Sequence, residues 1–170
     1  MARFDEVKAT FWSGDAYGVL PPLSEEMVKD AERLLDVSLP SSLVELLQTQ
    51  NGGGVAAAWD AFPTFDAPSW SEDHVPFDVL MGIGGHMSLL DTPYLVQEWG
   101  LPSPVVLLSG DGHCWIALDY RQCGRQGDPS ATWFDTELET EAALAPDFRS
   151  FVEGLTAGSD FVHEELDSAL

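Results

Sequence analysis

The first twenty residues carry one short apolar stripe followed by chain breakers. Phe4, Val7 and Phe11 recur at helical spacing and predict a helix over residues 2–12. Glycines and the pair Pro21-Pro22 then interrupt the pattern. Such a helix either covers a core as a lid or docks on a partner, and the pattern favours the lid.

The next segment predicts a helical hairpin over residues 24–50. Ser24 is a good N-cap for the first helix. Pro40 suits the first position of the second, because the N–H that proline lacks would find no partner there. Asn51-Gly52-Gly53-Gly54 tolerate positive φ and are expected to end the hairpin. The inward-facing residues of the two helices are Met27, Val28, Ala31, Leu34, Leu35, Leu43, Val44, Leu46 and Leu47.

The middle of the chain has no clear period. Residues 55–79 scatter aromatic side chains among prolines and acids, so we expect short strands or a long loop there. Residues 79–83 favour a strand. Residues 88–99 favour a helix whose start is limited by Pro93 and whose end is Gly100.

The remaining pattern predicts strands and one helix. Residues 104–109 form a continuous apolar run, and residues 113–120 alternate as their antiparallel partner would. A further strand is expected over 131–136 and a closing helix over 146–155. The fold class is therefore α+β, with an antiparallel meander sheet packed against the helical hairpin and a closing C-terminal helix. We expect one domain over residues 1–156, with its core at about 20–156, and an acidic tail over 157–170.

The charge of the 170-residue chain is strongly one-sided. There are 29 acidic and 7 basic residues, a net charge of −22, and no Lys or Arg lies between Arg33 and Arg121. Sites for nucleic acids and nucleotides need cations to neutralise phosphate, and anionic lipid headgroups repel such a surface. The composition therefore argues against nucleic-acid and membrane partners. The acidity either maintains solubility or attracts a basic protein.

Several weaker signals concern location. No apolar run approaches the length of a membrane span, and residues 1–10 lack the apolar core of a signal peptide. The two cysteines, Cys114 and Cys123, do not make a disulfide framework. We therefore expect a cytoplasmic protein.

Candidate catalytic chemistry is sparse. Asp111, His113 and Asp119 could offer carboxylates and an imidazole to a metal, although Asp-Gly is first a turn signal. Neighbouring His113 and Cys114 would point to opposite faces of a strand, so they are badly placed as base and nucleophile. We expect a protein that is not an enzyme and needs no cofactor, with a metal-dependent enzyme as the least favoured alternative.

Aromatic and acidic residues offer a different function. The chain has six tryptophans, of which we expect at least four to be buried. Exposed aromatic residues act as anchors in protein interfaces. The candidate partner-binding residues belong to one acidic, aromatic stretch: Asp60, Asp66, Trp70, Glu72 and Asp73.

Three blocks of sequence resemble the SUKH superfamily, the domain of the fungal cell-wall-assembly regulators (Smi/Knr). Residues 23–53 resemble its opening block, in which a helix, a Leu-Pro step and a second helix end in Asn-Gly-Gly. Residues 109–121, SGDGHCWIALDYR, resemble its central hairpin, and residues 145–155, APDFRSFVEGL, its closing helix. Asp36 departs from the pattern, since the family often has Gly there, and the stretch over 55–100 matches poorly.

The resemblance implies an α+β domain that binds proteins. Bacterial members are typically immunity proteins that block a cognate secreted toxin, often a nuclease or a deaminase. It therefore implies an immunity protein whose partner is a basic toxin. The alternative is a regulatory or scaffold protein of the cell-wall-assembly-regulator type with another protein partner. The sequence leaves the partner and the oligomeric state open.

Overall fold

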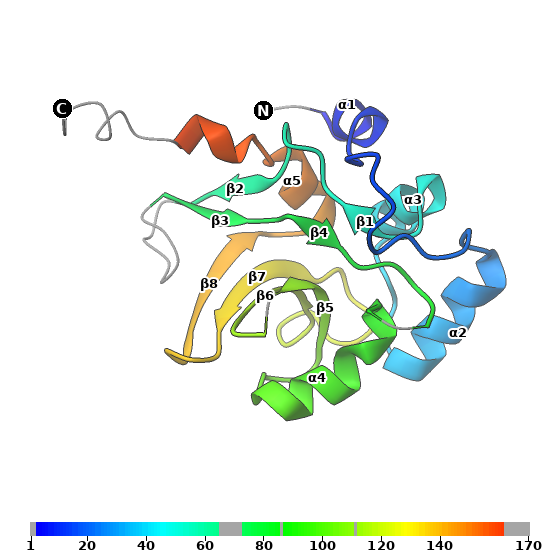
Figure 1. Ribbon diagram of the computed structural model, residues 1–170. Helices are drawn as coiled ribbons and strands as arrows, with labels where there is room; N and C mark the ends of the chain where they lie inside the picture. Colours follow the sequence, from blue (N-terminus) through cyan, green and yellow to red (C-terminus); the bar gives the residue numbers. More distant parts are fainter. Residues whose placement is uncertain (1–2, 65–72, 86, 111, 162–170) are drawn as a thin grey trace.

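The computed structural model describes residues 3–64, 73–85, 87–110 and 112–161, and Figure 1 shows the arrangement of their helices and strands. The structure confirms the α+β class. The predicted strands and helices of the C-terminal half are present. The helical segments are α1 Phe4–Ala9, α2 Glu25–Leu35, α3 Ser41–Thr49, α4 Thr92–Trp99 and α5 Phe148–Glu153, with 3-10 turns η1 Leu89–Asp91 and η2 Gly158–Phe161.

The strands form one meander sheet and two short ribbons. The sheet has the order β5-β6-β7-β8, with all neighbours antiparallel, and the ribbons pair β1 with β4 and β2 with β3. The strands are β1 Gly53–Gly54, β2 Ala61–Pro63, β3 His74–Pro76, β4 Val79–Leu80, β5 Val105–Gly110, β6 Cys114–Asp119, β7 Ser130–Asp135 and β8 Thr140–Ala145.

These elements stack in layers. Figure 1 shows α4 on one side of the four-stranded sheet and the ribbons, with α3 and α5, on the other. Among the described residues, none of the helices combines the length and apolarity that a membrane crossing requires.

The helical hairpin begins as the sequence predicts. Ser24 accepts a hydrogen bond from the Met27 N–H at 3.2 Å, the side-chain cap that serine supplies at a helix start. Asp36 then adopts a left-handed conformation with φ 56°, which glycine reaches without steric cost. Arg125 supplies hydrogen bonds to the end of this helix: its Nη1 donates to the carbonyl oxygens of Leu35 and Asp36, both at 3.4 Å.

Some expectations for the hairpin were wrong in detail. Leu34 is 57% exposed rather than buried, because α2 contacts the domain along a narrower stripe than its apolar pattern suggests. Pro40 lies just before α3, which begins at Ser41. Outside the hairpin, the helix predicted over 88–99 forms two elements, since η1 precedes α4.

Strand β8 was missed in the sequence. Its residues, Thr-Glu-Ala-Ala-Leu-Ala, include three alanines, which have low strand propensity and high helix propensity. The conformation comes instead from pairing with β7, whose residues Ala131 to Asp135 lie opposite Ala145 to Thr140. A bulge between Ala131 and Thr132 leaves Leu144 outside the regular register.

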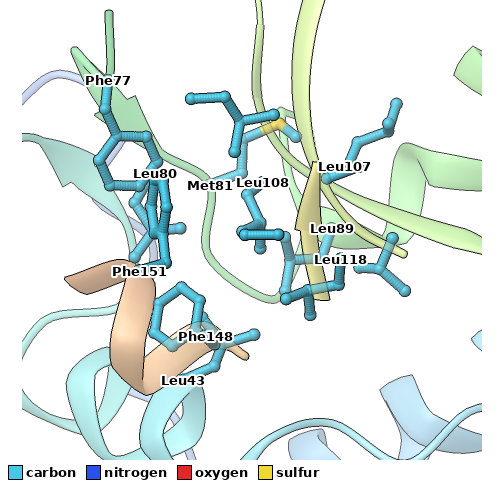
Figure 2. Close-up of a cluster of buried hydrophobic side chains, with 14 of the residues drawn as sticks. Leu43, Phe77, Leu80, Met81, Leu89, Leu107, Leu108, Leu118, Phe148 and Phe151 are labelled. Atoms are coloured by element: carbon cyan, nitrogen blue, oxygen red, sulfur yellow. The ribbon is translucent and has the colours of Figure 1, made fainter. Parts of the chain in front are cut away.

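The core lies between the ribbons, the sheet and the helices. Figure 2 shows Phe77 and Leu80, from the segment of β4, facing Phe148 and Phe151 of α5. The rings of Phe77 and Phe151 meet edge to face, with centroids 5.0 Å apart. Leu43 of α3 lies against the same cluster and is fully buried. The α5 aromatics therefore join the hairpin to the ribbons.

Asn51 makes the most extensively bonded connection between the hairpin and the ribbons. Its side chain is buried, its Nδ2 donates to the carbonyl oxygens of Pro21 (2.8 Å) and Ile83 (2.7 Å), and its Oδ1 accepts from the Ile83 N–H (2.8 Å). Next to it, Gly52 has φ +90°, and a Cβ there would lie 2.6 Å from the Gly82 nitrogen. The two backbones approach this closely only because neither residue has a side chain.

Replacing Asn51 tests this connection. We expect Asn51→Ala to lower the free energy of unfolding by about 3 kcal/mol, because it leaves the buried N–H and C=O of Ile83 without their partners. Gln48→Ala, at an exposed position of the preceding helix, should change it by no more than about 0.5 kcal/mol. Urea unfolding followed by circular dichroism measures both, and equal effects of the two substitutions would contradict the assignment.

Candidate protein-binding site

A groove of about 720 Å³ lies between the β2–β3 ribbon and strand β8, and we call it the β2–β8 groove. In Figure 1, β8 runs beneath these ribbon strands, and α5 lies behind the ribbon. The lining residues come from these elements and the segment after α5: Trp59, Phe62, Pro63, Thr64, Ala142, Ala143, Leu144, Ala145, Pro146, Ser150, Glu153, Gly154, Leu155 and Thr156. Few of these side chains are polar.

Close packing at the end of α5 shapes the groove. The Phe62 ring stacks on Phe151 with centroids 4.9 Å apart. A Cβ on Gly154 would come within 2.8 Å of the Phe62 ring, so glycine lets the helix end approach that ring. Ala61 and Thr156 hold the β2–β3 ribbon against the end of α5: their N–H groups donate to each other's carbonyl oxygens at 3.0 and 2.8 Å.

The groove has little chemistry of its own. Among its lining residues, Glu153 is the one ionisable group that the structure describes. Its carboxylate accepts a hydrogen bond from the Phe4 N–H at 3.1 Å and lies 3.8 Å from Arg149 Nε. Because that carboxylate is engaged with α1 and α5, the groove is suited to binding apolar side chains rather than to proton transfer.

Thr64 is the exception among the polar groups. Its hydroxyl is buried and has no hydrogen-bond partner within the described part of the chain. Its backbone N–H donates to the Asp73 carbonyl oxygen at 2.8 Å, which continues the β2–β3 pairing. A buried hydroxyl without a partner is unfavourable, because it has lost its bond to water and gained none in return.

The two edges of the four-stranded sheet differ. The β5 edge is covered: Met81 N–H donates to the Leu108 carbonyl oxygen at 2.9 Å, and the Leu107 N–H donates to Thr92 Oγ1 at 3.0 Å. The outer edge of β8 has no such backbone partner among residues 3–64, 73–85, 87–110 and 112–161. The open edge of the sheet therefore borders the groove.

The structure places two of the five sequence-predicted binding residues. Asp60 precedes β2 and its Oδ1 accepts from the Gly158 N–H at 2.7 Å. The Asp73 carboxylate lies 2.7 Å from His74 Nδ1 at the other end of the ribbon. Asp66, Trp70 and Glu72 lie outside the described residues. Asp60 thus has a local structural role, as a partner of η2, that the sequence did not indicate.

A third acidic residue, Asp78, lies between β3 and β4. Partial burial, and then the charge of Asp60, raise the pKa of the Asp78 carboxyl above its ordinary value. Both effects disfavour the ionised form, one by removing water and the other by like-charge repulsion. Ionisation of Asp78 is therefore unfavourable at this end of the ribbon, and a cation from a partner would make it more favourable.

The proposed metal ligands are not brought together. His113 and Asp119 lie at or beyond opposite ends of β6 and are six residues apart, which is roughly 20 Å along an extended strand. His113 Nδ1 is 3.9 Å from Glu137, and Asp119 pairs with Arg121 instead. Asp111 lies outside the described residues. No group of three metal-ligating side chains occurs in the part of the chain that the structure describes.

Asp119, Arg121 and Glu141 form an ion network that the sequence did not reveal. Arg121 Nη2 donates to Asp119 Oδ2 at 2.8 Å and also to Glu141 Oε2, so it links β6 to β8. Burial alone would raise the pKa of Asp119, but the hydrogen bonds and charge of Arg121 and the hydroxyl of Thr132 outweigh it. The pKa of Asp119 is therefore lowered.

The tryptophans are less buried than expected. Trp115 and Trp133 are buried, Trp12 and Trp59 are partly buried, Trp99 is 37% exposed, and Trp70 lies outside the described residues. The expectation of four buried tryptophans was wrong for a chemical reason. The indole N–H groups of Trp12 and Trp59 donate to the exposed Thr49 and Thr10, which holds one edge of each ring at the surface.

The basic side chains leave most of the acidity unneutralised. Five of the seven basic residues lie within 4.0 Å of a carboxylate of a described residue: Lys8, Arg33, Arg121, Arg125 and Arg149. With 29 acidic residues in the chain, fixed cations cannot balance the remaining carboxylates. The folded protein therefore presents a net negative potential.

Comparison with known proteins identifies a family. The model of the SMI1 / KNR4 family (SUKH-1) matches residues 22–154, well over half of the chain. The matched region begins just before α2 and ends just after α5, so it includes β2 and β8 of the groove and excludes α1. A comparison with curated proteins found no match.

Substitution of Arg121 tests the ion network. We expect Arg121→Met to lower the free energy of unfolding by about 2 kcal/mol at neutral pH, because Asp119 stays buried without its cation. Since the lowered pKa of Asp119 stabilises the fold only while the carboxylate is ionised, this difference should shrink as the pH falls below about 4. Arg33→Met breaks an exposed pair with Asp30 and should cost no more than about 0.5 kcal/mol. Urea titrations at both pH values measure these changes, and a pH-independent loss would contradict the prediction.

Proposed function

From the premise that the chain belongs to the SMI1 / KNR4 family (SUKH-1), we propose that it is a non-enzymatic binding module that neutralises a basic protein toxin. The observation that carries the proposal is the excess of carboxylates left after the ion pairs of the fold have formed. Bacterial members of the family typically act as immunity proteins, and a toxin that cleaves nucleic acid carries positive charge to bind phosphate. An acidic protein can occupy such a surface.

The charge distribution supports capture over long distances. A negative potential spread over the molecule attracts a basic partner before contact and can raise the association rate about 10- to 1,000-fold at low salt. Binding of this kind weakens as salt screens the charges. The cytoplasm is the compartment in which we propose that this protection takes place, because a toxin entering the cell would be met there.

The acidic residues around β2 and β3 support a binding site at this ribbon. Asp60, Asp73 and Asp78 flank β2 and β3, and the candidate residues Asp66, Trp70 and Glu72 belong to the stretch between these strands. Burial, and then the negative charge of Asp60, raise the pKa of Asp78 there. A cation from the partner would relieve this repulsion, so part of the binding free energy would come from the ribbon.

The direct test takes as the candidate toxin any basic protein whose gene lies next to the gene of this chain. Co-expression of this chain should restore the growth of cells that produce the candidate toxin. Isothermal titration calorimetry should detect a complex of the two proteins that weakens with added salt. Absence of binding at low salt would contradict the proposal. Salt-dependent binding without any effect on toxicity would instead favour the alternative, a regulatory or scaffold protein with another partner.

Neutralising three acids of the sequence between β2 and β3 tests where the partner binds. We expect Asp66→Asn, Glu72→Gln and Asp73→Asn in one variant to weaken binding about tenfold or more, because local charge pairs are lost. The matched control is Glu6→Gln, Glu26→Gln and Glu98→Gln, which removes the same charge from exposed helical positions. Equal losses in the two variants would show that net charge alone determines affinity, and would rule out the ribbon as the binding site.

A further inference from the structure

We propose that the partner binds through an extended segment that pairs with the open edge of β8 and places alternate side chains in the β2–β8 groove. This inference rests on the proposed function, because it supplies that function with a binding mode. It also specifies the chemistry of the partner segment, in which apolar and basic residues alternate.

The open edge provides the backbone part of the site. A sheet edge presents unpaired N–H and C=O groups, and an added strand satisfies them. The β5 edge is covered by bonds from Met81 and to Thr92, whereas the outer edge of β8 has no backbone partner in the described ranges. An extended segment can therefore add to this sheet at β8.

The groove provides the apolar part. Side chains alternate between the two faces of a strand, so those of an added strand that share the face of Ala142 point toward the groove. Ala142 lies opposite the buried Trp133 in the register of β7 and β8. The small side chains of β8 leave space that Phe62 and Trp59 bound on the far side. Branched apolar side chains of the partner would fill this space.

The opposite face of β8 favours a positively charged side chain on the added strand. Glu141 and Ala143 lie on the other face of β8, beside Phe134 and Thr132 of β7. The Glu141 side chain is 49% exposed and shares Arg121 with Asp119, so two carboxylates divide one guanidinium. A Lys or Arg of the added strand opposite Glu141 would balance this excess of negative charge.

Thr64 supplies an independent observation. Thr64 lines the groove, and its hydroxyl is buried and has no hydrogen-bond partner in the part of the chain that is described. A buried polar group of this kind is costly when unpaired. If the Thr64 side chain rotates toward the groove when a segment binds, a backbone group of that segment would bond to the hydroxyl and offset this cost in the complex.

A second copy of this chain is a less suitable occupant than a basic partner. Two copies joined edge to edge at β8 would each bring a net charge of −22 to the interface. Like charges oppose association at this scale. The charge of the molecule therefore favours a basic segment over self-pairing at the same edge.

The experiment uses the full chain and three synthetic peptides. The first alternates Val and Lys, the second has the same sequence with N-methyl groups on alternate backbone nitrogens, and the third alternates Val and Glu. Binding is followed by the chemical shifts of the protein amides and by their exchange with deuterium. We expect the Val-Lys peptide to shift the amides of residues 61, 62, 64 and 140–145 and to slow deuterium exchange in β8.

Backbone pairing predicts a specific order of affinities. N-methylation on the pairing edge removes hydrogen bonds and should weaken binding about tenfold. Equal affinity of the methylated peptide, or shifts confined to the helices, would overturn strand addition while leaving a basic partner possible. Equal, backbone-dependent binding of the Val-Glu and Val-Lys peptides would uphold strand addition and contradict the basic partner of the proposed function. Amide protection of β8 by concentration-dependent dimerisation, without peptide, would overturn the proposal in favour of self-pairing.

Thr64→Val separates binding from folding. Valine keeps the shape of threonine without the hydroxyl, so we expect thermal stability to stay the same or rise, because an unpaired buried group is removed. Affinity for the Val-Lys peptide should fall about threefold or more, since the bond formed in the complex is lost. Unchanged affinity in a folded Thr64→Val protein would show that the hydroxyl does not contact the bound segment.

Discussion

The arrangement of the helical hairpin and the ribbons depends on the close approach of two backbone segments around Asn51. A buried amide side chain bonds to Pro21 and Ile83, and Gly52 and Gly82 allow the backbones to meet. These bonds join the end of the helical hairpin to the segment after β4. Because β4 continues toward the covered edge of the sheet, the same contact positions the ribbons over β5–β8.

The position of the ribbons in turn creates the groove. Phe62 stacks on Phe151, and Ala61 and Thr156 exchange backbone bonds, so β2 is held above the end of α5. Strand β8 lies on the opposite side, tied to β6 through Arg121. The groove is therefore bounded by packed elements, and a bound segment would need little reorganisation of the described residues. Preorganisation of this kind favours affinity.

Two kinds of interaction contribute to the proposed binding. Unneutralised carboxylates act at long range and determine the sign of the partner's charge, whereas the groove and the sheet edge act on contact and determine its conformation. Electrostatic attraction without a shaped site would bind basic proteins indiscriminately. An open strand edge without negative charge would be prone to pair with other edges, including its own.

The sequence alone determined the elements that depend on local pattern. The hairpin, its Ser24 cap, the strands over 104–120 and 131–136, the closing helix and the family resemblance all follow from periodicity, capping and turn chemistry. The net charge was also available from the residues themselves. These features need little knowledge of distant contacts, because each one is determined by neighbours a few positions away.

Tertiary structure decided the rest. Strand β8 forms because β7 offers it a partner, against the helix propensity of its alanines. From the sequence, Asn51 is expected only to end a helix. The fold then brings Ile83 to its side chain. One strand holds His113 and Asp119 apart, whereas Arg121 contacts Glu141, twenty positions away in the sequence. The groove and the open edge join segments some eighty residues apart, and such pairings are determined by packing rather than by any local pattern.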